Sequence, residues 1–105
     1  MREKITEDTL KIMQLIEEDA SISQRKISKN LGLSLGKTNY CISSLVEIGY
    51  IKVKNFTHSH KKINYLYLLT PKGVKEKSII TKNFIKKKKE EYDIFIKNIN
   101  KTNTY

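Results

Sequence analysis

Apolar residues recur every three to four positions in the first 50 residues, a pattern typical of amphipathic helices around a shared core. The first predicted helix begins after Thr6, a suitable N-cap, and runs to about residue 19. Its apolar stripe consists of Leu10, Met13 and Ile16, with Ile12 and Leu15 at the flank. The connector that follows contains Ile22, which can pack ahead of the next helix as a hydrophobic staple.

Two further helices are predicted in the segment SQRKISKNLGLSLGKTNYCISSLVEIGYI, residues 23–51. Ser23 caps the first of them and Gly32 ends it, because glycine adopts the left-handed conformation of a C-cap without strain. Ser34 caps the second, and Gly49 ends it. Two helices joined by so short a turn predict a helix-turn-helix unit, whose second helix enters the major groove of DNA. A plain helical hairpin packed in a core is the alternative.

The second helix of this unit has two distinct faces. The buried face, at helical spacing, is Thr38, Ile42 and Leu45. The opposite face has small, amide, hydroxyl and cationic groups but no carboxylate, and consists of Leu35, Gly36, Lys37, Asn39, Tyr40 and Ser43. Exposed helix faces usually mix acids with bases, so the missing acids favour a polyanionic partner. Asn39 can pair with an adenine edge and Lys37 with guanine, or both can bind phosphate instead. Tyr40 can reach a phosphate or a thymine methyl, or be partly buried.

Beyond Gly49 the pattern changes from helical to alternating, which predicts two strands. The first covers residues 50–54, with Ile51 and Val53 on one face and lysines on the other, and the second covers residues 63–69. The predicted loop between them, residues 55–62, is polar and basic. A basic hairpin directly after a helix-turn-helix unit predicts a wing that lies along the DNA backbone.

A long helix is predicted from Pro71 to about Ile99, because proline is favoured at the first helical position after a capping residue such as Thr70. Lysines 86–89 interrupt its apolar pattern, so a regular coiled coil is not predicted. A helix this long cannot bury an apolar stripe on so small a domain. We therefore expect a second copy to cover the stripe, with folding back on the same domain as the alternative. The residues expected in a dimer interface are Phe84, Ile85, Tyr92, Phe95 and Ile99.

Charge is unevenly distributed along the 105 residues, whose formal net charge is +10. Residues 1–20 have a net charge of −3, residues 21–71 of +7 and residues 72–105 of +6. Positive charge therefore gathers on the helix-turn-helix unit, its hairpin and the C-terminal helix, as nucleic-acid binding requires. Membrane-surface binding also uses basic charge, but no stretch is apolar enough to span a bilayer.

Catalysis and metal binding have little support in the sequence. The single cysteine, Cys41, cannot form an intrachain disulfide and fits a reducing cytoplasm, and we expect it to be a small buried hydrophobe. Cys41, His58 and His60 lack the spacing of a structural zinc site, and no cofactor is predicted. The chain has no assignable nucleophile–base pair and no phosphate-binding glycine loop, so we do not expect an enzyme.

Three segments resemble the winged helix-turn-helix regulators of the MarR type, namely SQRKISKNLGLS, LVEIGYIKV and YLYLLTPKG. The last is similar to the L-T-x-x-G turn that follows the wing in that family. The short length and the segment LGLSLGKTNYCISSL look most like the small EPS-associated MarR-family regulators. This narrower resemblance implies control of exopolysaccharide genes.

The resemblance also implies where DNA would touch the chain. The contacts expected from the recognition helix are Ser34, Gly36, Lys37, Asn39, Tyr40 and Ser43. Those expected to touch phosphate from the preceding helix are Ser23, Gln24 and Arg25. Those expected from the wing are Lys54, His58, His60, Lys61 and Lys62.

We therefore expect a mainly α fold with a small β-hairpin. A winged helix-turn-helix DNA-binding domain would occupy residues 1–71, and a C-terminal helix with a dimerisation stripe and a basic tail would occupy residues 72–105. The expected function is sequence-specific binding of double-stranded DNA by a cytoplasmic, dimeric transcriptional regulator, most often a repressor. The alternatives are a module that docks a protein partner and a module that binds RNA.

Overall fold

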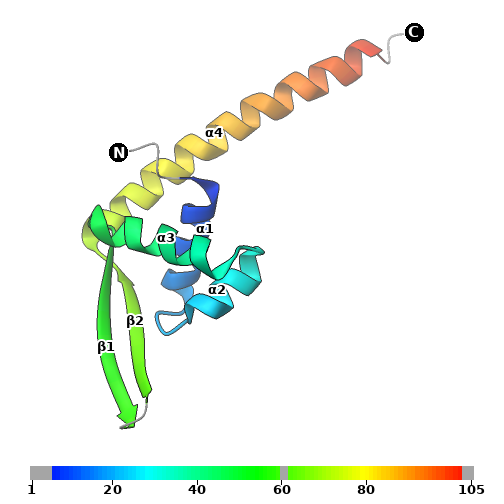
Figure 1. The fold of residues 1–105 in the computed structure, drawn as a ribbon. Coiled ribbons are helices and arrows are strands. Elements are labelled where there is room, and N and C mark those ends of the chain that lie inside the picture. The colour runs from blue at the N-terminus through cyan, green and yellow to red at the C-terminus, as the bar shows by residue number, and fades with distance from the viewer. Residues whose placement is uncertain (1–5, 60–61, 103–105) are drawn as a thin grey trace.

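The computed structural model describes residues 6–59 and 62–102, which form four helices and one two-stranded antiparallel hairpin. In chain order the elements are α1 (Glu7–Glu18), α2 (Gln24–Leu31), α3 (Leu35–Glu47), β1 (Ile51–Ser59), β2 (Lys62–Leu69) and α4 (Pro71–Thr102). Figure 1 shows α1, α2 and α3 grouped beside the base of the hairpin, with the hairpin and α4 extending away from this body in opposite directions. The predicted fold, a winged helix-turn-helix with a long C-terminal helix, is confirmed.

Capping groups fix the helix boundaries, as the sequence predicted. The hydroxyls of Ser23 and Ser34 each accept the backbone N–H three residues later, at 3.1 Å and 3.0 Å. Thr70 caps α4 in the same way at 3.0 Å. Gly32 and Gly49 have φ angles of +67° and +85°, the left-handed region that favours glycine. These local signals place α2, α3 and the start of α4.

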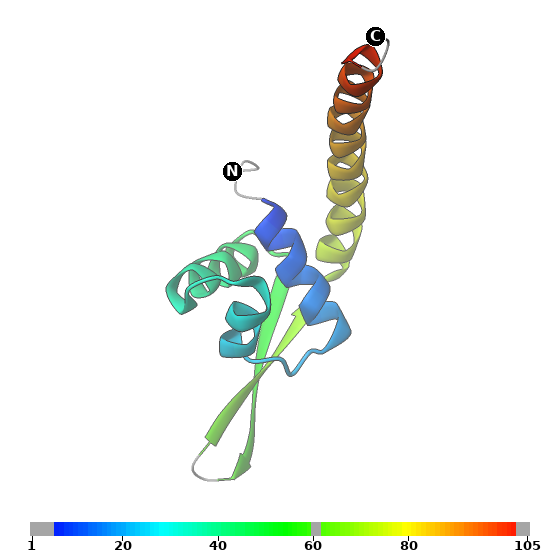
Figure 2. The ribbon, with the colours of Figure 1, turned by 90° about the vertical axis from the view of Figure 1, so that its right-hand side faces the viewer.

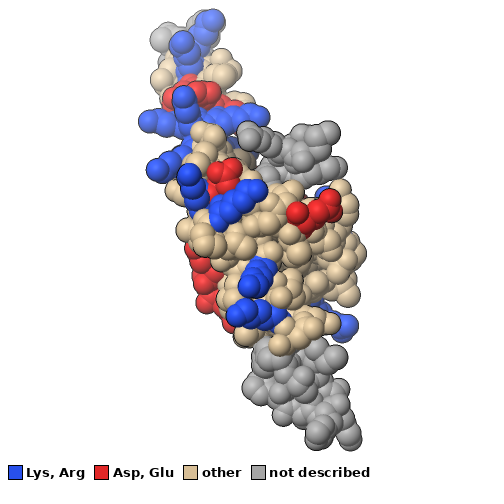
Figure 3. Space-filling model, turned by 90° about the vertical axis from the view of Figure 1, so that its left-hand side faces the viewer, with Lys and Arg blue, Asp and Glu red and all other residues tan. Residues whose placement is uncertain are grey.

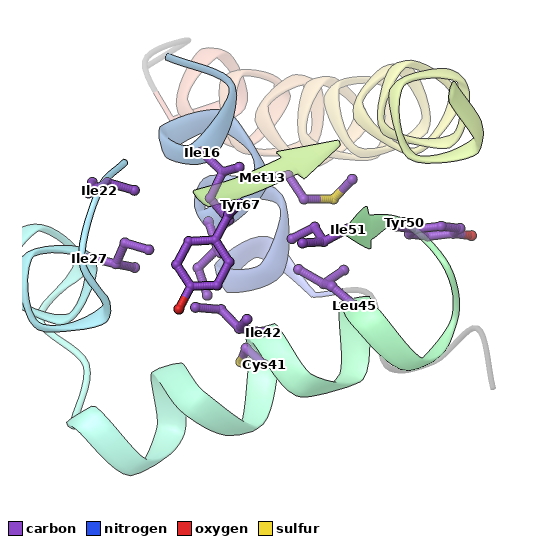
Figure 4. Packing of buried hydrophobic residues seen from close by; sticks show 11 residues of the cluster. Met13, Ile16, Ile22, Ile27, Cys41, Ile42, Leu45, Tyr50, Ile51 and Tyr67 are labelled. Carbon is purple, nitrogen blue, oxygen red and sulfur yellow. The ribbon is translucent and has the colours of Figure 1, made fainter. Parts of the chain in front are cut away.

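The core lies between the first three helices and the base of the hairpin, as Figure 4 shows. Its hydrophobic members are Ile12, Met13, Ile16, Ile22, Ile27, Cys41, Ile42, Leu45, Tyr50, Ile51 and Tyr67. One expectation for α1 was wrong: Ile12 is fully buried whereas Leu10 is only partly buried. The reason is that α1 contacts both α3 and β2, and the side wedged between them is centred on Ile12 and Ile16.

The hairpin is longer than the sequence predicted. Antiparallel pairing begins at Ile51 opposite Leu69 and continues to Thr57 opposite Ile63, with a register shift before Ser59. Residues 55–59, expected to be loop, therefore belong to β1. The outer part of this two-stranded ribbon extends beyond the helices, as Figure 2 shows, so it has no core against which to bury one face. Backbone pairing holds it without the apolar alternation by which strands are recognised.

The helix α4 docks on the body only through its first turns. Lys77 Nζ lies 2.6 Å from Glu17 Oε1 on α1, and the Tyr50 hydroxyl donates to Glu76 Oε1 at 3.4 Å. Ile80 packs against the core. The remaining turns project outward, which gives the molecule its extents of 71 × 27 × 22 Å. A 32-residue helix is about 48 Å long, so most of α4 stands free of its own domain.

Candidate nucleic-acid interface

A buried pair of hydroxyls sets the relation of α3 to α2. Ser28 Oγ donates to Thr38 Oγ1 at 2.7 Å, and Thr38 Oγ1 donates to the backbone oxygen of Ser34 at 3.0 Å. Thr38 is fully buried, and Ser28 nearly so. Each hydroxyl is satisfied, so the pair costs little and fixes one helix against the other. Sequence reasoning placed Thr38 on the buried face but missed Ser28.

The face of α3 opposite the core is open to solvent. Leu35 and Tyr40 are 48% and 53% exposed, and the remaining face residues, Gly36, Lys37, Asn39 and Ser43, are exposed as well. The first carboxylate of α3 is that of Glu47, the last residue of the helix. The alternative of a partly buried Tyr40 ring does not hold. The structure thus brings the predicted recognition-helix residues together on one accessible, carboxylate-free surface, which we call the α3 face.

Gln24 connects this face to the hairpin. Asn39 Nδ2 donates to Gln24 Oε1 at 3.2 Å, and Gln24 Nε2 donates to the Tyr67 hydroxyl at 3.1 Å. The Gln24 amide, expected to contact phosphate, therefore lies between α3 and β2. No sequence signal pointed to this role, because the bond to Tyr67 joins residues 43 positions apart.

The other predicted contacts surround the α3 face. Arg25 is exposed on α2 and Lys54 on β1, while the Ser23 hydroxyl is engaged as a helix cap. His58 lies in β1, and Lys62 begins β2. His60 and Lys61 lie outside the described residues.

A groove of about 950 Å³ runs between α3 and the hairpin. The residues of α3 that line it are Asn39, Ile42, Ser43, Val46 and Glu47. The residues of the hairpin that line it are Val53, Tyr65 and Tyr67, and residues 21–24 complete the lining. Because three separate segments form this groove, periodicity along the chain could not predict it. We call it the wing groove.

The α4 residues expected at a dimer interface stand away from the body. Ile85, Tyr92, Phe95 and Ile99 are about 60% exposed, whereas Phe84 is partly buried. Lys88 Nζ lies 5.5 Å from the centroid of the Phe84 ring. Figure 3 shows Lys and Arg side chains gathered along the upper, α4 part of the molecule, with a few acidic ones between them.

Cys41 lies on the buried side of α3, as expected, and is 4% exposed. Burial raises the pKa of its thiol, an effect that outweighs the opposing influence of Lys37. The thiolate needed for redox chemistry is therefore disfavoured. The described residues contain no group of three or more His, Cys, Asp or Glu side chains that could hold a metal ion. No helix in the described part of the chain is long and apolar enough to cross a membrane.

The comparisons with known proteins agree with this geometry. A family model for winged helix-turn-helix DNA-binding domains matches residues 9–52. The sequence has no significant match among curated proteins. A solved variant of ZitR from Lactococcus lactis has a TM-score of 0.65 at 22% identity, over 89% of this chain and 62% of that one. The adhesin competence repressor AdcR of Streptococcus pyogenes has a TM-score of 0.64 at 18% identity, over 93% and 66% of the two chains.

A MarR/EmrR family transcriptional regulator from an Acinetobacter species has a TM-score of 0.62 at 23% identity, over 93% of this chain and 75% of that one. This chain spans less than two thirds of the length of ZitR and of AdcR. At such identities the likeness is one of fold. The chain therefore contains a winged helix-turn-helix domain and shares the fold of MarR-family regulators.

Proposed function

We propose that this chain binds double-stranded DNA through the α3 face and regulates transcription. The observation that carries the proposal is the composition of this face, from Leu35 to Ser43. It is exposed and free of carboxylates in a chain that has 11 acidic residues. Amide, hydroxyl and ammonium groups match the acceptors and donors of base edges and the charge of phosphates. An α-helix also fits the major groove of B-DNA, whereas the deep, narrow major groove of duplex RNA does not admit one.

Asn39 is the residue we assign to base reading. One of its two Nδ2 hydrogens is donated to Gln24, which leaves one N–H and the Oδ1 acceptor. This remaining pair matches N7 and N6 of adenine, the usual bidentate partner of an asparagine. The bond from Gln24 to Tyr67 fixes the orientation of the Gln24 amide in turn. Lys37 on the same face and Arg25 on α2 are assigned to guanine or phosphate.

The functional unit that we propose is a homodimer formed through α4, with residues 72–105 as the dimerisation segment. The free part of α4 exposes the apolar side chains of Ile85, Tyr92, Phe95 and Ile99. Burial of each such side chain is worth about 1.5–3 kcal/mol, and an identical helix offers a matching stripe. Lys88 is the member of the tetralysine run that lies over Phe84, so it borders the stripe without occupying its centre.

A dimer would present two α3 faces to one side of the duplex. In dimeric helix-turn-helix proteins the two half-sites lie about one helical turn apart, so we expect an inverted repeat as the operator. Occupation of a promoter by such a dimer excludes other proteins from it, which favours repression over activation. The resemblance of LGLSLGKTNYCISSL to EPS-associated regulators makes an exopolysaccharide gene cluster the first candidate target.

The electrostatic part of the proposal is tested by measuring affinity for a fluorescently labelled duplex at several salt concentrations. The logarithm of affinity should fall with the logarithm of salt concentration at a slope of about −0.9 per phosphate contacted. If Lys37 touches phosphate, Lys37→Ala should make this slope shallower by about 0.9. Lys97→Ala, which removes the same charge from an exposed position on distal α4, is the control and should leave the slope unchanged. A flat salt response, or equal losses in the two variants, would contradict the assignment.

A further inference from the structure

We propose that the wing groove binds a small hydrophobic organic cation, and that its occupant competes with DNA. The groove volume of about 950 Å³ falls within the range of about 300–1,000 Å³ typical of small-molecule sites. Its two walls carry apolar side chains that the fold leaves accessible: Val46 on α3 is 39% exposed, and Val53 and Tyr65 on the hairpin are 37% and 48% exposed. Covering these three side chains provides a hydrophobic contribution to binding.

The charge of the occupant follows from Glu47. Among the described residues that line the groove, Glu47 is the only one with a charged side chain, and it is the only acid in residues 21–71. None of the ion pairs between described residues involves its carboxylate. A neutral or anionic ligand that covered this carboxylate would remove it from water without compensation, whereas a cation compensates its charge.

An aromatic ring offers a second contact for a cation. Tyr65 lines the wall opposite Glu47, and its ring is half exposed. A cation over the face of such a ring gains about 0.5–1 kcal/mol at an exposed site. The carboxylate on one wall and the ring on the other therefore select the same kind of ligand.

A DNA strand is the competing occupant, because the groove lies between a recognition helix and a wing. Its phosphates would pass beside the Glu47 carboxylate and be repelled by it, which disfavours this filling. The residues Asn39 and Ser43, however, belong both to the groove lining and to the α3 face. A bound cation would therefore lie against residues that we assign to DNA. Only this second step rests on the proposed function.

The site is tested on the full chain, without DNA, by fluorescence anisotropy with rhodamine 6G, a cationic xanthene dye. Fluorescein, an anionic dye with the same ring system, is the charge control. We expect saturable binding of rhodamine 6G and none of fluorescein. Glu47→Gln should weaken binding about fivefold, the effect of losing about 1 kcal/mol of ion pairing. Glu90→Gln, which removes an exposed acid from α4, should bind like the parent chain.

Tyr65 is tested by two substitutions that differ only in the ring. Tyr65→Ala should weaken dye binding about threefold, whereas Tyr65→Phe should keep it, since phenylalanine also presents an aromatic face. Absence of saturable rhodamine 6G binding, equal binding of fluorescein, or equal effects of Glu47→Gln and Glu90→Gln would overturn the site.

Competition is measured by repeating the titration with duplex DNA present. Linkage requires that the factor by which the dye weakens DNA binding equals the factor by which DNA weakens dye binding. If the dye binds as expected and DNA affinity is unchanged by it, the competition is refuted. If the chain binds the dye but no DNA, the proposed function fails while the site in the wing groove stands.

Discussion

Replacing Gly73 by alanine should destabilise the fold, because the added methyl group has no space. Gly73 is buried in the first turn of α4, and a Cβ atom on it would lie 2.1 Å from the backbone oxygen of Tyr50 and 2.9 Å from its carbonyl carbon. That oxygen also accepts the Thr70 N–H at 3.0 Å. The contacts are to backbone atoms, so no side-chain rotation relieves them. The start of α4 would have to move away from the residue that leads into β1.

The expected size of the effect follows from three contributions. Overpacking of a tight site costs about 1–3 kcal/mol. Displacement of α4 also endangers the cap bond from the Gly73 N–H to Thr70 Oγ1, and a lost cap costs about 1 kcal/mol. The better helix propensity of alanine returns up to about 1 kcal/mol. The net destabilisation should be about 2 kcal/mol, which lowers the Tm of a domain of this size by about 8–16 °C.

The assay is thermal unfolding followed by far-UV circular dichroism at one fixed protein concentration, since the Tm of a dimer depends on concentration. Gly36→Ala is the matched control. A Cβ on Gly36 would meet no atom within 4 Å, so this variant should be as stable as the parent or more stable by up to about 1 kcal/mol. A Gly73→Ala protein with an unchanged or higher Tm would refute the close docking of α4 on Tyr50.

Three further predictions concern the dimer, the cysteine and an exposed carboxylate. Tyr92→Asp should yield a monomer in size-exclusion chromatography with light scattering, while Lys97→Ala stays dimeric; a dimeric Tyr92→Asp protein would count against the α4 interface. Iodoacetamide should modify Cys41 far more slowly in the native protein than in urea, because the thiol is buried and its pKa is raised; equal rates would exclude this environment. Hydrogen bonds from the Ser21 hydroxyl and backbone N–H lower the pKa of Asp19 below its ordinary value of 3.8. Its ionised form therefore contributes stability that is present above that value and is lost as the pH falls through the lower folded-state pKa. Asp19→Asn should remove this part of the acid dependence in urea titrations, and an identical dependence in both proteins would contradict the assignment.

The local features of the fold could be predicted from the sequence because they depend on neighbouring residues. The cap at Ser34 and the turn at Gly32 each involve groups within four positions along the chain. The carboxylate-free surface of α3 was predictable for the same reason, since helical periodicity alone separates Asn39 from Ile42.

Features that join distant segments could not be predicted in this way. The ion pair of Lys77 with Glu17 spans 60 positions, and neither residue has a sequence pattern that marks its partner. The bond from Gln24 to Tyr67 is of the same kind, and so is the wing groove. The extension of β1 beyond Lys54 was missed for another reason, because an exposed two-stranded ribbon needs no apolar alternation.

The most direct test of DNA reading by the α3 face is capture of fragmented genomic DNA by the intact protein and by an Asn39→Ala, Lys37→Ala double variant, followed by sequencing. The parent protein should enrich a single inverted repeat whose half-sites lie about one helical turn apart, and the double variant should lose that enrichment. If the parent captures no sequence above background, or if the double variant enriches the same repeat equally well, the α3 face does not read DNA.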